Sequence, residues 1–262
     1  MCTTSIRLQC MAPAEEGPPT GPYGRHVLVA AAVCPHPPLL VPQLAAGAAP
    51  DLDEVRAACD AAVAGLLAER PDEIVVVGAD PEGGNYPAAA GASMLPYGVD
   101  LRVGGPEGEL PLALAIGAWL LDRADLSSPV SFAGIAPDAP TSRCRALGRA
   151  LAAATDRVAL LVMADGSARR TARSPGRHDE RGEPFDASVT AALSSGDVAA
   201  LVALDPTLAS ALMVEGRAAW QVLAGAAEPA SGPTPVIDAR VLFDRAPYGV
   251  GYVVATWRYR TE

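Results

Sequence analysis

The stretch from His26 to Leu44, HVLVAAAVCPHPPLLVPQL, decides the fold that this sequence predicts. Its first part, Val27–Val33, is a wholly apolar run of β-branched and small residues, which is typical of a strand buried on both faces. The run ends at Cys34-Pro35, and the prolines at 37, 38 and 42 can continue neither a strand ladder nor a helix. His36 is therefore expected in a stiff loop past the carboxyl end of the strand, the edge of an open α/β sheet where ligands bind.

The position of His36 alone leaves two interpretations open. Backbone dihedrals fixed by proline on both sides favour a preorganised imidazole at a ligand site. A surface-loop histidine, or a buried one with its hydrogen bonds satisfied, would have the same sequence neighbours.

The composition limits the class of protein. With 262 residues, half of them hydrophobic, the chain is long enough for one large α/β domain or two small ones. No apolar run reaches the ~20 residues that a membrane span needs, so no membrane partner is expected. All twenty basic residues are Arg, which excludes a lysine nucleophile or Schiff base. A net charge of −10 argues against nucleic acid, because duplex binding requires a basic surface.

The cysteines and the first residues indicate the compartment and the domain boundaries. Five cysteines, at positions 2, 10, 34, 59 and 144, form no CxxC pair, which favours reduced thiols in a cytoplasmic protein. Residues 1–25 lack the apolar core of a signal peptide and are rich in Pro, Gly and Glu. We expect a disordered leader over residues 1–25 and one α/β domain over residues 26–262.

A crossover unit follows the first loop. Asp51–Arg70 has apolar residues at helical spacing with Asp51 as the expected cap, and Glu73–Val77 is a second buried strand. The two strands should be parallel and neighbouring, or nearly so. The loop after the second strand carries Asp80 and Asn85. Asp80 is either a ligand for a hard or borderline metal or a turn former before proline.

The rest of the chain continues the alternation of strands and helices. The expected elements are strands at Val130–Ile135 and Val158–Met163 and helices at Leu110–Leu121, Thr141–Thr155 and Ala187–Ser194, the last capped by Asp186. Two β-rich segments, Thr234–Phe243 and Tyr248–Trp257, should form a C-terminal antiparallel hairpin. The predicted fold class is α/β: a single domain with a twisted, mostly parallel or mixed sheet flanked by helices.

Three short motifs match one family at the level of residues. His36-Pro37 follows the first strand, Asp165-Gly166-Ser167 follows the fourth, and Tyr248-Gly249 stands near the end. In these features, over most of residues 26–257, the chain resembles the class III extradiol dioxygenases, the LigB-like superfamily that includes the Memo-like proteins. The resemblance implies the same fold, His36 as a metal ligand, and a 2-His-1-carboxylate iron site that opens catechol rings.

The chain departs from this pattern at two expected metal ligands. Asp80 stands where the family usually has a second ligand His. Glu215 precedes Trp220 by five positions, whereas the family's last ligand Glu stands nearer to four before its Trp. On a helix this slip rotates the carboxylate by about 100°. The alternative for Glu215 is an ordinary exposed carboxylate at a helix start.

The catalytic positions are also incomplete. The family typically reads Gly-Asp-x-Ser-His where this chain has Asp165 and Ser167, the candidate catalytic residues, followed by Ala168 in place of the catalytic His. Ala cannot supply the proton transfer that a positioned His provides. His178, in the polar loop Ser174–Asp186, is the candidate replacement if that loop closes as a lid. The alternative is a solvent-exposed polar loop.

Two function hypotheses follow. In the first, the chain is a ring-opening oxygenase for catechol-type substrates, with His36, Asp80 and Glu215 holding Fe(II), Mn or Zn. In the second, it is a catalytically silent small-molecule binding or scaffold protein of the same fold without metal. Either way the pocket for an aromatic ligand should include three residues: Pro37, Asn85 and Tyr248, the last having a packed strand-end Tyr as its alternative.

The sequence gives little support for a hydrolase or a nucleotide-binding protein, and it favours association with a second copy of the chain. The sequence has no GxSxG elbow of a hydrolase and no Walker or GxGxxG loop after a strand. The apolar helix over residues 110–121 and the edge of the terminal hairpin favour a homo-oligomer, here a homodimer.

Overall fold

Strand β1 (Leu28–Cys34) is the apolar stretch from which the fold was predicted, and six of its seven residues are buried. The structure is a computed structural model in which residues 28–229 and 236–260 are described. The expected leader, residues 1–25, and His26 lie outside the described residues. Alternate residues of β1 face opposite cores, with Ala31 and Val33 on one side and Ala30 and Ala32 on the other.

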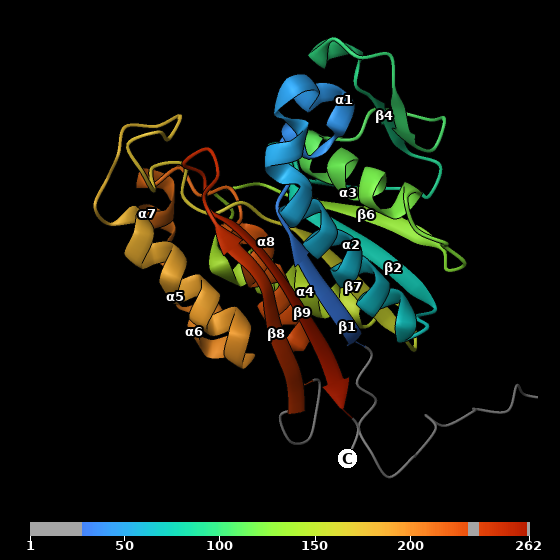
Figure 1. The fold of residues 1–262 in the computed structure, drawn as a ribbon. Helices are drawn as coiled ribbons and strands as arrows, with labels where there is room; N and C mark the ends of the chain where they lie inside the picture. Colours follow the sequence, from blue (N-terminus) through green and yellow to red (C-terminus); the bar gives the residue numbers. More distant parts are fainter. Residues whose placement is uncertain (1–27, 230–235, 261–262) are drawn as a thin grey trace, which may run out of the picture.

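Seven strands form one mixed sheet in the order β3-β6-β2-β7-β1-β9-β8 (Figure 1). The parallel part contains β1, β2 (Glu73–Ala79), β6 (Val130–Ile135) and β7 (Val158–Met163). Antiparallel strands complete both edges: β3 (Gly84–Tyr86), β9 (Tyr252–Arg260) and β8 (Val236–Arg245). The predicted α/β class and C-terminal antiparallel hairpin are therefore confirmed.

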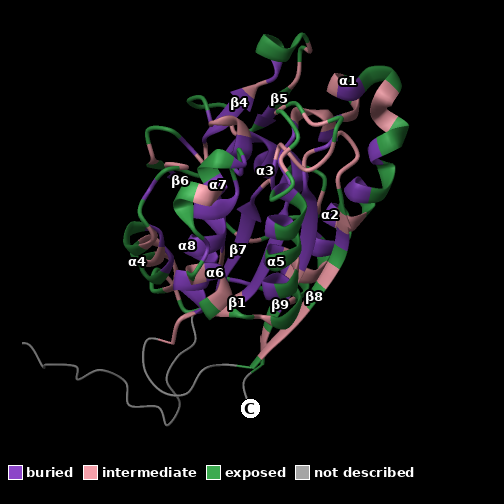
Figure 2. Cartoon of the chain, turned by 90° about the vertical axis from the view of Figure 1, so that its left-hand side faces the viewer, coloured by how far each residue is buried: buried purple, intermediate pink, exposed green. Residues whose placement is uncertain are grey.

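Helices cover both faces of this sheet, and the buried strands lie between them (Figures 1 and 2). Helices α2 (Asp53–Ala68) and α3 (Leu112–Asp122) pack on one face, and α5 (Gly182–Ser195) and α8 (Arg217–Ala227) on the other. Helix α4 (Thr141–Ala152) packs against α8. In the described part of the chain, no helix has the length and apolar character needed to cross a membrane.

Short elements connect these layers. Those before α2 are η1 (Pro38–Leu40), α1 (Pro42–Ala45) and η2 (Ala46–Leu52). An arm above the sheet contains β4 (Gly91–Ser93), η3 (Leu95–Tyr97) and β5 (Arg102–Gly104). Helices α6 (Val198–Val202) and α7 (Pro206–Ala211) lead from α5 toward α8. The prolines after β1 thus produce 3-10 and helical turns, which carry the chain off the sheet edge.

The first two long strands, β1 and β2, are parallel and nearly neighbouring, as predicted, with one strand between them. Strand β7 lies between β1 and β2, pairing in parallel with both. Strands in a sheet are about 4.8 Å apart, so the loop after β2 starts about 10 Å from the loop after β1. This spacing separates Asp80, which follows β2, from His36, which follows β1, and it brings Asp165 after β7 beside His36.

Two aspartates expected as helix caps have other partners. Helix α2 begins at Asp53, and Asp51 lies in η2, where it accepts a hydrogen bond from the Tyr248 hydroxyl. Asp186 lies inside α5 and accepts a hydrogen bond from the backbone N–H of Ser167. Each carboxylate forms a tertiary contact that sequence spacing does not reveal.

Candidate functional site

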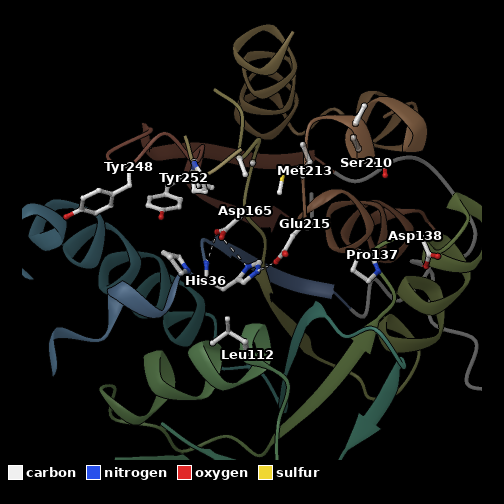
Figure 3. Close-up of a pocket in the computed structure, with 18 of the residues that line it drawn as sticks. His36, Leu112, Pro137, Asp138, Asp165, Ser210, Met213, Glu215, Tyr248 and Tyr252 are labelled. Carbon is white, nitrogen blue, oxygen red and sulfur yellow. Dashed lines mark hydrogen bonds and ion pairs between the residues drawn. The ribbon is translucent and has the colours of Figure 1, made fainter. Parts of the chain in front are cut away.

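A pocket of about 960 Å³ lies at the carboxyl ends of β1 and β7. Its walls come from the loops after β1, β6 and β7, from α7 and the segment between α7 and α8, from the start of α3, and from the turn between β8 and β9 (Figure 3). Most of the lining is apolar, including Leu39, Leu112, Met213 and several prolines. This volume falls within the range of small-molecule sites.

His36 lies at the base of this pocket between two carboxylates. Its backbone N–H donates to Oδ1 of Asp165 at 2.8 Å, and its Nε2 lies 3.1 Å from Oε2 of Glu215. Its Nδ1 is 3.7 Å from Oδ1 of Asp165 and has no hydrogen-bond partner, although the residue is only 2% exposed. The structure therefore fits the interpretation of His36 as a preorganised imidazole at a pocket better than its interpretation as a surface-loop histidine.

The backbone around Asp165 explains why these three side chains meet. The N–H of Ala164 donates to the carbonyl of Cys34 at 2.8 Å, which extends the β1–β7 ladder to the start of both loops. The N–H of Gly216 donates to the carbonyl of Asp165 at 2.9 Å, which places Glu215 beside the same loop. Glu215 precedes α8 by two residues and is not on the helix, so the expected helical rotation of its carboxylate does not apply.

The electrostatics of the three groups are coupled. Burial lowers the pKa of His36, but the charge of Asp165 and the contact with Glu215 raise it by more, so the net shift is upward. The hydrogen bond from His36 lowers the pKa of Glu215, whose side chain is 64% exposed. Burial raises the pKa of Asp165, and the imidazole offsets part of that rise. The arrangement favours a protonated imidazole beside an ionised Glu215.

Two further pocket residues match the sequence-based expectation. Pro37 and Tyr248 both line the pocket. The Tyr248 hydroxyl donates to Oδ2 of Asp51 at 3.0 Å, so its ring forms the wall while its oxygen is held at the rim.

Other expected site residues do not reach this pocket. Asp80 is buried, but it accepts hydrogen bonds from the Tyr86 hydroxyl at 2.9 Å and from the N–H of Glu82 at 3.1 Å. Asn85 is exposed on the edge strand β3. Neither is among the pocket-lining residues, because β2 and β3 are separated from β1 by β7. The expected approach of Asp80 and Asn85 to His36 was wrong.

Ser167 and His178 are also placed outside the lining. The Ser167 hydroxyl donates to the carbonyl of Leu212 and accepts from the N–H of Arg169, both at 3.0 Å. The side chain is fully buried and fixes the loop. His178 is exposed on the loop before α5. Ala168, at the position where the resemblance implied a catalytic His, does line the pocket.

Two ionisable residues of the pocket, Tyr252 and Asp138, were missed, as were the hydroxyl residues Thr207 and Ser210. Tyr252 is buried and lines the pocket. Its pKa is raised, mainly by burial and to a smaller extent by the negative charge of Asp165. It is the first residue of β9, which runs antiparallel to β1, so the amino end of β9 meets the carboxyl end of β1. That topology was the available signal. Asp138, in the loop after β6, lines the pocket as an exposed carboxylate.

The donor set does not fit the 2-His-1-carboxylate site that the resemblance implies. His36 and Glu215 converge, but the third expected ligand, Asp80, is bonded elsewhere. Among residues 28–229 and 236–260, no three His, Cys, Asp or Glu side chains are grouped closely enough to hold a metal ion. One imidazole and one carboxylate are fewer protein ligands than a non-heme iron centre uses.

Comparisons with known proteins show the fold and no more. No protein-family model matches this chain, and no curated protein matches its sequence. The chain is similar to the crystal structure of uncharacterized protein JW3007 from Escherichia coli K12, with a TM-score of 0.51 and 16% identity. The match covers 88% of this chain and 99% of that chain. This likeness supports the arrangement of the sheet and its helices.

Proposed function

We propose that this chain binds a small aromatic ligand in the His36 pocket and that His36 exchanges a proton with it. The observation that carries the proposal is the position of one buried imidazole between Asp165 and Glu215, at the base of a pocket of about 960 Å³. We propose further that the chain is LigB-like in fold, lacks the three-ligand metal site, and works in the cytoplasm. Its described cysteines, Cys34, Cys59 and Cys144, are free and buried, in keeping with that compartment.

The chemistry of the three groups supports proton transfer. Because its pKa is raised, the imidazole is available as a general acid near neutral pH. Glu215 has a lowered pKa and a largely exposed carboxylate, so it stays ionised and stabilises the protonated imidazole. Asp165 accepts from the backbone of His36 and fixes the loop that holds the ring. Tyr248 and Tyr252 provide aromatic wall on the other side of His36 from Glu215 in the view of Figure 3.

Calorimetric binding of 4-methylcatechol tests this proposal. The wild-type chain should bind the probe, and His36→Asn should weaken binding by about tenfold or more, about 1.4 kcal/mol. His178→Asn is the matched control, because the exposed His178 lies outside the pocket. Equal affinity of the wild type and His36→Asn for 4-methylcatechol would contradict the proposal. So would the absence of binding by the wild type.

A metal-dependent oxygenase is the second candidate, favoured by one observation. Nε2 of His36 and Oε2 of Glu215 are 3.1 Å apart, a separation at which two ligands can share one cation. Elemental analysis after reconstitution with Fe(II), Mn or Zn separates the candidates. Stoichiometric metal that is lost in His36→Ala, together with O₂ uptake on catechol addition, would favour the oxygenase. Metal at background level in both the wild type and His36→Ala would favour the metal-free binding site.

A further inference from the structure

The charged groups that line the His36 pocket are strongly biased toward acids. Three carboxyl groups, Asp138, Asp165 and Glu215, line it together with one imidazole. Among the described residues of the lining there is no Arg, and the chain contains no Lys. The charged part of the lining therefore consists mainly of hydrogen-bond acceptors, beside the neutral hydroxyl groups of Thr207, Ser210, Tyr248 and Tyr252.

Two nearby guanidinium groups are held by other partners, and Arg169, whose buried Nε has no hydrogen-bond partner among the described residues, lies outside the pocket lining. Nη1 of Arg170 lies 3.0 Å from Oδ1 of Asp244 and 3.7 Å from Oδ2 of Asp186. Arg217 is buried and donates to the backbone carbonyls of Pro137 and Ala139. Neither side chain lines the pocket, so neither presents a donor to a bound molecule.

The buried imidazole adds an independent sign of a ligand. His36 lines the pocket, and its Nδ1 has no hydrogen-bond partner among the described residues. A buried polar atom without a partner costs free energy unless a ligand or water supplies one. A hydroxyl group on the ligand can accept from Nδ1–H when the ring is protonated and can donate to Asp165.

We propose that the ligand of this pocket is an aromatic amine with a ring hydroxyl, bound as its ammonium ion; this inference rests on the proposed function. The ammonium group donates hydrogen bonds only, which matches carboxylate acceptors, whereas a carboxylate or phosphate ligand would meet repulsion from the same groups. In the view of Figure 3, Glu215 and Asp138 lie on one side of His36 and the rings of Tyr248 and Tyr252 on the other. The ammonium group is assigned to the side of Glu215 and Asp138, and the ring to the tyrosine side.

Three probes test the charge preference by calorimetry. All have a phenol ring with a two-carbon substituent in the para position, and they differ in the charge that this substituent carries. They are tyramine, a cation; 4-(2-hydroxyethyl)phenol, which is neutral; and 4-hydroxyphenylacetate, an anion. Tyramine should bind at least about tenfold more tightly than the anion, with the neutral phenol between them. Weak binding of tyramine relative to either other probe would overturn the inference and leave the proposed function standing, whereas no binding of any probe would contradict both.

Two variants locate the preference in the pocket. Asp138→Asn and Glu215→Gln should each reduce the advantage of tyramine over the neutral phenol by several-fold, because each removes one negative charge. Asp125→Asn is the matched control: Asp125 is exposed before β6 at the opposite end of that strand from Asp138, and it does not line the pocket. An equal loss in the control, or an unchanged advantage in both pocket variants, would overturn the assignment of the ammonium site.

Discussion

Nε2 of His36 lies 3.1 Å from Oε2 of Glu215, although 179 positions separate the two residues in the sequence. The contact joins the loop after β1 to the segment before α8, and Asp165 holds both: its side-chain Oδ1 accepts from the N–H of His36, and its backbone carbonyl accepts from the N–H of Gly216. Because His36 is buried and Glu215 is largely exposed, the pair connects the base of the pocket to its mouth.

The His36 contacts predict a pH dependence of stability. A histidine whose pKa is higher in the folded than in the unfolded state stabilises the fold fully below its unfolded value, here near 6.5, and loses that contribution as the pH rises through the folded value. The difference in free energy of unfolding between wild type and His36→Asn should therefore shrink as the pH rises above about 6.5. Urea denaturation across this range measures it. In a Glu215→Gln background the change should be smaller; the same change in both backgrounds would contradict the contact.

Asp186 predicts a pH dependence of the same sign as that of His36, which is the reverse of what a paired carboxyl group usually gives. Burial raises its pKa to about 6, and the Ser167 N–H and Arg170 lower it only in part. The native state then binds a proton more tightly than the unfolded chain. The free energy of unfolding should therefore fall by roughly 1 to 3 kcal/mol as the pH rises from 4 to 6. Asp186→Asn should flatten this slope in chemical denaturation. A variant with the wild-type slope would show that another group is responsible.

Gly249 and Gly98 form a matched pair for backbone strain. Both have positive φ angles, +81° and +87°, but a Cβ on Gly249 would overlap the backbone nitrogen of Ser174, whereas a Cβ on Gly98 would enter open space. Gly98→Ala should cost about 1 kcal/mol, from conformation alone. Gly249→Ala should cost about 2 to 4 kcal/mol, because the turn carrying Tyr248 must also move. Thermal denaturation distinguishes them, and equal costs would be inconsistent with the close approach.

Arg217 should contribute strongly to the stability of the fold, although its hydrogen-bond partners are uncharged. It is 1% exposed and donates to Pro137, Ala139 and Gln221. Arg217→Met would leave these buried acceptors unpaired and should cost about 2 to 4 kcal/mol in free energy of unfolding. Arg143→Met, an exposed position on α4, should stay within about 0.5 kcal/mol. Comparable losses for the two variants would argue against the buried network.

Much of the fold could be predicted because its strands are continuous apolar runs. The strands around Val33, Val76 and Leu160 are buried on both faces, and such runs can be recognised without tertiary information. Strand order could not be predicted in this way. Local patterns do not specify which parallel strand lies beside β1, and the insertion of β7 there separated Asp80 from His36.

The site could be predicted most directly where a residue follows β1 or its parallel neighbour β7. His36 and Asp165 satisfy this condition, and Glu215 reaches them through the backbone hydrogen bond of Gly216 to Asp165. Tyr252 was missed because its place depends on the antiparallel pairing of β9 with β1, which the alternation of residues in a hairpin does not reveal. The homodimer stays a prediction, although the apolar helix α3 packs on β2 and β7 of its own chain.

The most direct test of the central claim follows the ring signals of His36 by NMR while tyramine is added. The chain has three histidines, and His36→Asn assigns the signal of interest. We predict saturable shifts of the His36 ring signals in the wild type and in Glu183→Gln, an exposed change on α5, and much weaker shifts in Glu215→Gln. Saturable binding of tyramine by calorimetry without any change at His36 would contradict the claim that this imidazole is the centre of the ligand site.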